Sequence, residues 1–304
     1  MHANDRKRED SIPAREMHAS FFDLKSSIES GQPLAFHCDY RENGKLSNLS
    51  YATAKGLMEM ECSRTEKATL IRYRHFGEYT DSSAREEIKR RFGLGDDMNK
   101  VYSRINTDRF MDDAIMRLKG MRVTENDPWE TMLSFIVSQF NNIKRIRGIV
   151  KSMKERYGES ADYGGREVKL FPTYERISKA SVEELMKCGA GFRAKYIKCA
   201  AEACAEGFNL EELRRMEYSD AREELMKLSG IGGKVADCIL LFGYRRLEAF
   251  PVDVWIKRVV EITYMNGRKS KDREIIEFAS GKWGDMAGYA QQYIYWYGRM
   301  NKIG

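Results

Sequence analysis

The stretch Leu228-Ser-Gly-Ile-Gly-Gly-Lys-Val-Ala-Asp237 decides the fold of the second half of this chain. It predicts a helix-hairpin-helix, with one helix ending at Ser229 and the next beginning at Lys234. Between them the chain turns through Gly230 and Gly232, because glycine tolerates positive φ and lets another backbone approach closely. The free amides at the start of the second helix suit a DNA phosphate. The hairpin therefore predicts a grip on a nucleic-acid backbone without sequence readout.

Two charged residues, one in this hairpin and one after it, are candidates for a catalytic role. Lys234 stands at the mouth of the hairpin, and Asp253 follows in the separate segment Pro251-Val-Asp-Val-Trp255. A lysine amine that has lost its proton can attack the anomeric carbon of a nucleotide, displace the base and open to a Schiff base, from which β-elimination cuts the strand. A carboxylate such as Asp253 stabilises the positive charge that develops on the sugar. Singly, the lysine reads as a phosphate contact and the aspartate as a helix cap; together and in this order they favour a catalytic pair.

The composition fits an ordinary globular protein, and its modest net charge does not by itself indicate nucleic acid; basic clusters beside the other candidate DNA contacts favour a phosphate role over a solvated helix face. The 304 residues carry a net charge of +6, and basic residues cluster at 144–147 and 193–195. No apolar stretch approaches the ~20 residues of a membrane span. The first 15 residues are polar and charged without an apolar core, so we expect no secretory signal. We expect no membrane partner, a monomer, and a cytoplasmic, nucleoid-associated or nuclear location.

Cysteine and histidine positions argue against a metal cofactor. The six cysteines contain no Cys-x-x-Cys pair, and the four histidines all lie in the first quarter of the chain. Neither a zinc site nor an iron–sulfur spacing is present, so we expect no required cofactor and no metal held by side chains. Scattered cysteines without an export signal are typical of a reducing compartment.

The hydrophobic pattern predicts two domains of different class. Short alternating runs predict strands over 34–40, 49–53, 56–62 and 69–76, with a turn at 42–44 and covering helices after Asp81. From Asn126 the pattern is almost wholly helical, and Asp127-Pro128-Trp-Glu130 is a strong helix start. We expect an α+β fold, with an antiparallel β-domain and flanking helices followed by an all-α helix-hairpin-helix domain. The expected boundaries are 1–18 (flexible tail), 19–125 (α+β domain) and 126–304 (helical domain).

Helices are expected over several ranges of the second domain. They are 128–139, 143–157, 181–187, 194–206, 209–215, 220–228, 235–242, 254–262 and 286–297.

The residues from Leu228 to Val260 resemble the helix-hairpin-helix DNA glycosylases, and within them the eukaryotic-type 8-oxoguanine DNA glycosylases. The similarity covers most of the chain after Ser30, thinly at first and strongly after Asp127. It implies a bifunctional glycosylase and AP lyase of base excision repair. Such an enzyme flips 8-oxoguanine out of double-stranded DNA, removes it through a Schiff base on Lys234, and cuts the strand by β-elimination.

The resemblance also implies which residues meet the lesion. In Ser30-Gly-Gln32, the carbonyl of Gly31 would accept from the N7–H that distinguishes 8-oxoguanine from guanine. In Lys234-Val-Ala-Asp-Cys238, the cysteine would pack against one face of the flipped base. The segment Gly288-Tyr-Ala-Gln-Gln-Tyr-Ile-Tyr295 would bring Gln291 to the base edge and Tyr295 to the other face.

Further residues are implied to contact the duplex. Gly191-Phe-Arg-Ala-Lys-Tyr196 is similar to a segment with an intercalating aromatic, here Phe192, and an arginine toward the opposite base, here Arg193. Ser138-Gln-Phe-Asn-Asn-Ile-Lys-Arg-Ile146 resembles the turn that fills the gap in the duplex. This turn contributes Phe140, Asn141, Asn142 and Arg145. The hairpin carbonyls near Gly230 and Gly232 are implied to hold a structural monovalent or divalent cation.

Three positions depart from the family pattern. Phe140 replaces the first of three asparagines, which changes the residue that occupies the vacated space. Trp255 replaces a phosphate-binding histidine, and Gly298 stands near the place of the aspartate that supports it. Two alternatives stay open: a related glycosylase for alkylated or other damaged bases, and a non-catalytic DNA-binding module. Lys234 argues against the first, and the absence of a four-cysteine cluster argues against an iron–sulfur endonuclease.

Overall fold

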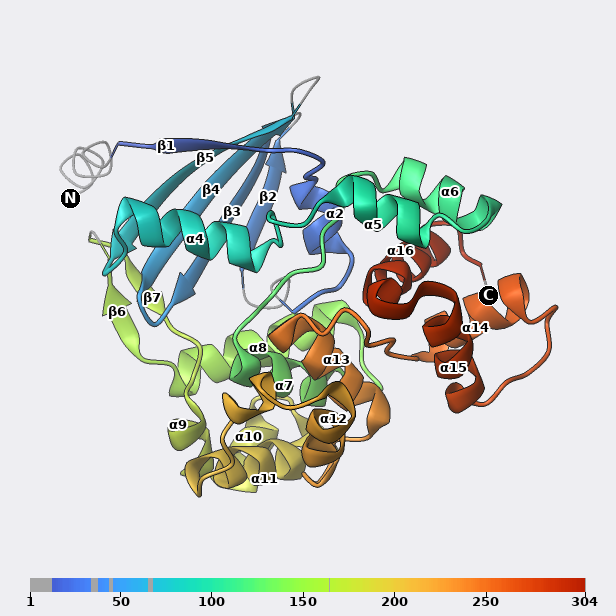
Figure 1. The fold of residues 1–304 in the computed structure, drawn as a ribbon. Coiled ribbons are helices and arrows are strands. Elements are labelled where there is room, and N and C mark those ends of the chain that lie inside the picture. Colours follow the sequence, from blue (N-terminus) through green and yellow to red (C-terminus); the bar gives the residue numbers. More distant parts are fainter. Residues whose placement is uncertain (1–12, 34–37, 44–45, 65–67, 164, 304) are drawn as a thin grey trace.

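The computed structural model describes residues 13–33, 38–43, 46–64, 68–163 and 165–303. A five-stranded antiparallel sheet from the first part of the chain lies beside a helical body from the second (Figure 1). The expected α+β class is confirmed.

The sheet is a simple meander with one added edge strand. Its strands are β1 (Arg15–Ala19), β2 (Asp39–Asn43), β3 (Leu46–Thr53), β4 (Gly56–Arg64) and β5 (Thr69–Gly77), in the order β1-β5-β4-β3-β2. The register places Leu49 opposite Met60 and Cys62 opposite Ile71, and all four side chains are buried. Helix α4 (Asp81–Arg91) covers this apolar face and buries Ala84 and Ile88 against it (Figure 1). The buried residues that alternate with more exposed ones along β1, β4 and β5 therefore form much of the first core.

The N-terminal expectations need two changes. Within the expected tail of 1–18, residues 15–18 belong to β1, which pairs with β5 over Arg15–Tyr73 to Ala19–Thr69, and residues 1–12 lie outside the described residues. The expected strand over 34–40 begins at Asp39 within the described residues, since 34–37 lie outside them; the turn position Gly44 also lies outside.

The remaining elements are helical apart from one small hairpin. In the N-terminal part these are α2 (Leu24–Glu29), α5 (Met98–Ile105) and α6 (Arg109–Arg117). The second part contains α7 (Pro128–Ser138), α8 (Ile143–Tyr157), β6 (Ser160–Asp162), β7 (Glu167–Lys169), α9 (Tyr174–Ser178), α10 (Val182–Lys187), η1 (Gly191–Arg193), α11 (Ala194–Ala205), η2 (Glu212–Arg214), α12 (Tyr218–Met226), α13 (Gly233–Tyr244), α14 (Val254–Tyr264), α15 (Asp272–Trp283), η3 (Gly284–Met286) and α16 (Ala287–Met300).

Several of these elements differ from expectation. The helix before the hairpin ends at Met226 rather than Ser229, because 227 and 228 continue in tighter i→i−3 turns. The range 209–215 contains only the 3₁₀ turn η2, and the β6–β7 hairpin and α15 were not expected. Arg166, in the turn between β6 and β7, forms an ion pair with Glu59 of β4, which joins this β-hairpin to the five-stranded sheet.

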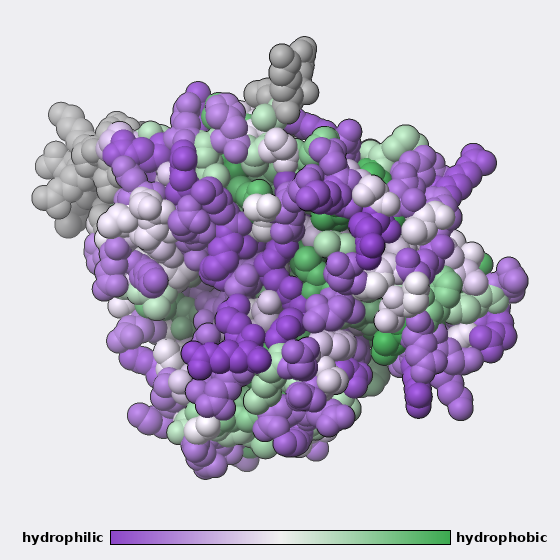
Figure 2. All heavy atoms as spheres, in the orientation of Figure 1, coloured by the Kyte–Doolittle hydropathy of each residue, from purple (hydrophilic) through white to green (hydrophobic). Residues whose placement is uncertain are grey.

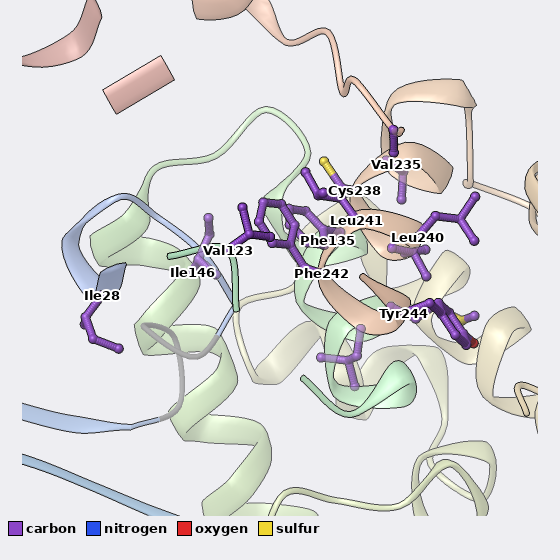
Figure 3. Close-up of a cluster of buried hydrophobic side chains, with 14 of the residues drawn as sticks. Ile28, Val123, Phe135, Ile146, Val235, Cys238, Leu240, Leu241, Phe242 and Tyr244 are labelled. Carbon is purple, nitrogen blue, oxygen red and sulfur yellow. The ribbon is translucent and has the colours of Figure 1, made fainter. Parts of the chain in front are cut away.

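Helix α7 is the centre of the second core. Asp127 caps it by accepting from the amide of Glu130 at 3.0 Å, and Pro128 occupies its first turn. Nearly every side chain from 128 to 137 is buried, as expected for a helix surrounded by others. Phe135 stacks on Phe242 of α13, with ring centroids 5.6 Å apart (Figure 3). This contact fixes α13, the helix that follows the glycine hairpin, against the core.

Buried polar contacts join the two parts. The guanidinium of Arg122 donates to the carbonyls of Ser20, Phe21, Gly93 and Asp96. The carboxylate of Asp96 accepts from Arg245 at the end of α13 at 2.5 Å, and from Tyr289 of α16. Helices α5 and α6 also pack on α16 (Figure 1). Helices α5 and α6 therefore precede the boundary expected near 125 in the sequence but pack against the C-terminal helix α16, and the boundary stays a prediction.

The outer surface is predominantly hydrophilic in the view of Figure 2, with apolar residues in small separate patches. In the part of the chain that the structure describes, no helix has both the length and the apolar character to cross a membrane.

Candidate active site

The glycine hairpin joins α12 to α13 in a conformation that requires a glycine at position 230, whereas Gly232 has a φ of −90° and space around it. Gly230 has a φ of +85°, and a Cβ there would lie 2.3 Å from the Tyr196 ring. Gly232 is the N-cap of α13 and offers no side chain to its first amides. Those amides are therefore available to an anion from outside the protein.

Lys234 and Asp253 come to one cavity from separate elements. Lys234 lies in the first turn of α13, with its Nζ 5.3 Å from the centroid of the Phe135 ring. Asp253 is the N-cap of α14, and its Oδ1 accepts from the amide of Ile256 at 2.8 Å. Both residues line a cavity of about 360 Å³. A nucleophile and a carboxylate can therefore reach the same bound group.

The cavity collects side chains from five regions of the chain. Its walls come from the loop after α2, from α7 and the start of α8, from α13, from the loop before α14, and from α16. The lining residues are Ser30, Gly31, Phe135, Ser138, Asn141, Asn142, Ile143, Ile146, Lys234, Cys238, Phe242, Pro251, Asp253, Trp255, Gln291, Gln292, Tyr295 and Arg299. All four residues expected at the lesion are among them.

Cys238 and Tyr295 are both held in their neutral forms. Burial raises the pKa of the Cys238 thiol to about 12, although the nearby Lys234 charge opposes this shift. Cys238 lies beside Phe135 in the apolar cluster of Figure 3. Burial also raises the pKa of Tyr295, whose hydroxyl accepts from Arg299 Nη1 at 2.8 Å. A neutral, polarisable sulfur and a neutral ring suit contact with the face of a base.

Gly31 is held close to Tyr295 by its neighbour Gln32. Gly31 has a φ of +78°, and a Cβ there would lie 3.6 Å from the Tyr295 hydroxyl. The side chain of Gln32 is fully buried. Its Nε2 donates to the backbone carbonyl of Arg122 at 2.7 Å, and its Oε1 accepts from the backbone amide of Thr124 at 2.7 Å. Sequence reasoning missed Gln32, because glutamine gives no sign in a single sequence that it will be buried.

Gln291 is held in a similar way. Its Nε2 donates to the carbonyl of Pro251 at 3.1 Å, and its Oε1 accepts from Gln292 Nε2 at 2.8 Å. One N–H and one lone pair of the Gln291 amide remain for a ligand. Sequence reasoning also missed Gln292, whose buried Oε1 has no hydrogen-bond partner among the described residues.

The asparagines expected to contact DNA also shape the turn between α7 and α8. Asn142 caps α8 by accepting from the amide of Arg145 at 3.0 Å. Asn141 donates to the carbonyl of Val137 at 3.0 Å and accepts from the amide of Asn142 at 3.0 Å. Arg145 and Phe140 are exposed beside them.

Arg193, whose expected role as a reader of the opposite base stays a prediction, contacts the protein itself. It is 3% exposed, and its guanidinium donates to the carbonyls of Gln139 and Phe140. Burial lowers the pKa of Arg193, and the charge of Arg145 adds to this effect. Arg193 faces the protein because the tight turn between α7 and α8 leaves carbonyls that need donors.

The two other departures from the family pattern have structural correlates. Trp255 lies between two guanidinium groups, with Arg258 Cζ 5.7 Å and Arg299 Cζ 5.6 Å from its ring. At Gly298 a Cβ would lie 2.6 Å from Val259 Cγ2, so this glycine lets α16 approach α14 closely. An aspartate at this position would require the Val259 side chain or α14 to shift.

The expected hairpin cation stays a prediction. The Gly230 carbonyl already accepts from Gln139 Nε2 at 3.0 Å, so a cation would have to share this oxygen. The described residues contain no group of three or more histidine, cysteine or acidic side chains that could hold a metal ion.

Comparison with known proteins agrees with this geometry. Residues 15–132 match the 8-oxoguanine DNA glycosylase N-terminal domain, and residues 133–285 match the HhH-GPD superfamily base excision DNA repair proteins. A probable N-glycosylase/DNA lyase of Methanothermobacter thermautotrophicus is 32% identical over 257 residues, which cover 78% of this chain and 82% of that protein.

Two solved structures share almost the whole fold. One is MBOgg1 in complex with a low affinity DNA ligand, with a TM-score of 0.84 and 33% identity over 96% of this chain and 99% of that one. The other is the 8-oxoguanine glycosylase/lyase of Clostridium acetobutylicum in complex with double-stranded DNA containing cytosine opposite 8-oxoguanine, with a TM-score of 0.82 and 28% identity over the same shares. The chain therefore belongs to the HhH-GPD superfamily of base excision DNA repair proteins, as a member with the N-terminal domain of the 8-oxoguanine DNA glycosylases.

Proposed function

We propose that this chain, a DNA glycosylase with AP lyase activity, removes 8-oxoguanine from double-stranded DNA through a Schiff base on Lys234. One observation carries the proposal: Lys234 and Asp253 line the same cavity of about 360 Å³, together with Cys238 and Tyr295. A DNA-binding module that used its hairpin only as a phosphate clamp would need neither Asp253 nor a cavity. A monomeric state and a location with nuclear or nucleoid DNA stay predictions.

The reaction follows from the two charged groups. The unprotonated amine of Lys234 forms a bond to C1′ of the flipped nucleotide, and the glycosidic bond breaks with its electron pair on the departing base. Positive charge develops on the sugar during this step, and the Asp253 carboxylate stabilises it. The nitrogen then loses a proton and its lone pair forms the C1′=N bond of the Schiff base, while the C1′–O4′ bond breaks with its electron pair on O4′, which takes up a proton. Loss of a C2′ proton expels the 3′ phosphate and cuts the strand.

Recognition of the lesion uses fixed polar groups. The Gly31 carbonyl, positioned by Gln32, would accept from the N7–H of 8-oxoguanine, whereas guanine presents a lone pair there. A buried acceptor left without its donor costs roughly 1–3 kcal/mol, which favours the lesion. The remaining hydrogen-bonding capacity of Gln291 would meet another edge of the base. Cys238 and Tyr295 would pack against its two faces.

Borohydride trapping tests this proposal. The labelled substrate is a duplex with one 8-oxoguanine opposite cytosine, compared with an undamaged duplex. We expect a lesion-dependent covalent adduct with the wild-type protein and none with Lys234→Gln, which should still bind the duplex. Lys227→Gln, which changes an exposed lysine just before the hairpin, is the matched control and should trap like wild type.

The possible failures have different meanings. Released base without an adduct would mean that Asp253 activates water and that the Schiff base is wrong. Neither adduct nor released base would overturn the 8-oxoguanine assignment, and a panel of alkylated bases would then follow. An adduct that persists in Lys234→Gln would assign the nucleophile to another amine.

A further inference from the structure

Gln292 is a buried glutamine in the wall of the cavity that no step of the proposed reaction uses. It follows Gln291 on α16, is 4% exposed, and lines the same cavity as Lys234 and Asp253. Its Oε1 is buried and has no hydrogen-bond partner among the residues that the structure describes. An acceptor that loses water without gaining a donor is unfavourable, so a buried oxygen of this kind suits a ligand that brings a donor.

A fixed order of hydrogen bonds decides which way the two amides face. The backbone carbonyl of Pro251 can only accept, so Gln291 must turn its Nε2 toward this carbonyl, at 3.1 Å. The Oε1 of Gln291 can also only accept, so Gln292 must offer its Nε2 to it, at 2.8 Å. Rotating either amide by 180° would bring two oxygen acceptors together. The unpartnered end of Gln292 is therefore its oxygen.

The two glutamines then offer a ligand a definite pattern of donors and acceptors. Gln291 keeps one N–H and one lone pair after its two bonds, and Gln292 adds the oxygen that has no partner. The Watson–Crick edge of a guanine presents O6 as an acceptor, N1–H as a donor and the 2-amino group as a second donor. When Gln291 bonds to O6 and N1–H, the 2-amino group lies beyond N1, on the side of the Gln291 oxygen. Gln292 is bonded to that same oxygen.

We propose that Gln292 is a specificity-determining residue that accepts a hydrogen bond from the 2-amino group of the extruded base, and that it also positions the amide of Gln291. The inference rests on the proposed function, because it needs a purine from the duplex in the cavity, and it narrows the substrate to purines with a 2-amino group. An adenine-type base has an acceptor at N1 and no 2-amino group, so it would leave Gln292 without a donor. The Gly31 carbonyl would then select for oxidation, whereas α16 would select for the parent base.

Two lesions that differ only in the 2-amino group test this inference. They are 8-oxoguanine and 8-oxohypoxanthine, which keeps O6, N1–H and N7–H, and each is placed opposite cytosine in the same duplex. With subsaturating wild-type protein we expect release of 8-oxohypoxanthine to be roughly 5- to 150-fold slower, as for one buried acceptor left without its donor. The hypoxanthine pair has one hydrogen bond fewer and opens more easily, so the cost of extrusion cannot produce this difference. Equal rates for the two lesions would overturn the inference.

The variant Gln292→Met removes the acceptor and keeps a side chain of similar length. We expect the ratio of the two release rates, 8-oxoguanine over 8-oxohypoxanthine, to fall to about one or below, because neither base then meets an oxygen at this position. Loss of the hold on Gln291 would slow both reactions alike, so the ratio isolates the bond to the 2-amino group. A lower rate for both lesions at the wild-type ratio would mean a structural role only and would overturn the inference. Met300→Ala, at an exposed position on the same helix, should keep both rates.

The role of Gln292 and the proposed function fail in different ways. Thermal unfolding shows whether Gln292→Met is folded, and Gln292→Leu repeats the comparison with another apolar shape if it is not. A protein that releases both lesions at equal rates would keep the proposed function and lose the role of Gln292. A protein that releases neither lesion and forms no adduct with 8-oxoguanine would lose the proposed function, and this inference with it.

Discussion

Asp253 combines two roles in one carboxylate. It caps α14 through its bond to the amide of Ile256, and it faces the cavity that holds Lys234. The cap needs only a side-chain oxygen that accepts a hydrogen bond, whereas the proposed reaction needs a negative charge. Replacement of Asp253 by asparagine keeps an oxygen that can cap the helix and removes the negative charge.

We predict that Asp253→Asn leaves stability almost unchanged and lowers base release by roughly 10²- to 10³-fold, the usual scale for loss of one electrostatic stabiliser. Asparagine caps about as well as aspartate, whereas Asp253→Ala should lose about 1 kcal/mol of stability in addition. Urea denaturation and single-turnover excision measure the two effects. Near wild-type excision by Asp253→Asn would limit this residue to a structural cap.

At the scale of single residues, the sequence predicted which residues share a cavity better than it predicted their contacts. Lys234, Asp253, Cys238 and Tyr295 were named from motifs, and they line one cavity. Arg193 was expected to face DNA, but a motif does not state which carbonyls lie within reach of a guanidinium in the folded chain. Gln32 was overlooked for the same reason: besides local bonds to Ser27 and Ser30, its side chain bonds to backbone groups of residues 122 and 124, about ninety positions away.

Among the elements, α12 and α13 are tied together by a buried carboxylate. Asp237 of α13 is 1% exposed, and its Oδ1 accepts from Arg222 Nε at 2.6 Å and from the Tyr218 hydroxyl at 2.7 Å. Burial raises the pKa of Asp237, while Arg222 and Tyr218 oppose the shift. A Cβ at Gly233 would lie 2.2 Å from Arg222 Nη2, so a glycine there makes room for the pair. This contact sets the start of the helix that carries Lys234.

We predict that Arg222→Met lowers the free energy of unfolding by about 3–5 kcal/mol, because it leaves a buried charge without its cation. The double variant Arg222→Met/Asp237→Asn should recover much of this loss, since it removes the charge. Thermal and urea unfolding measure both. As a control, Arg273→Met breaks an exposed pair with Glu277 and should change stability by less than about 0.5 kcal/mol. A loss below about 1 kcal/mol in Arg222→Met would show that the pair does not fix the hairpin.

Local signals explain which elements could be foreseen. The helix expected over 143–157 has those bounds, because Asn142 caps it and Gly158 follows it. The β6–β7 hairpin was missed because each strand has three residues and is stabilised by tertiary contacts, including Arg166 with Glu59 and with the Phe76 ring. A contact between residues about a hundred positions apart leaves no local pattern.

In the whole molecule, the junction of the two parts holds a cluster of charged side chains, in which Arg91 is buried and Glu130 and Lys154 are half-buried. Glu130 of α7 lies near Arg91 of α4 and Lys154 of α8, and next to its own cap Asp127. Burial, together with the Asp127 charge, raises the pKa of Glu130 to about 8, although Arg91 and Lys154 oppose the shift. Burial likewise lowers the pKa of Lys154. Packing the two parts against each other therefore favours an uncharged Glu130 at neutral pH.

This proton links folding to pH with a definite sign. In the unfolded chain Glu130 loses its proton near pH 4.5, whereas in the folded protein it keeps it up to about pH 8. The folded state therefore binds more protons in this window. The contribution of Glu130 to the stability of the folded state is largest below pH 4.5. This contribution falls as the pH rises to about 8, by at most about 1.4 kcal/mol per pH unit for one proton.

We predict that Glu130→Gln flattens the pH dependence of stability between pH 5.5 and 7.5, because glutamine is neutral in both states. The measurement is the free energy of unfolding in urea at three pH values for wild type, Glu130→Gln and Glu155→Gln, the last being an exposed position on α8. Other carboxyls titrate equally in all three proteins, so the difference between the slopes isolates Glu130. Glu155→Gln should keep the wild-type slope. An equal slope in Glu130→Gln would mean that Arg91 and Lys154 keep this carboxylate charged, and that the junction is held by an ion cluster instead of a neutral acid.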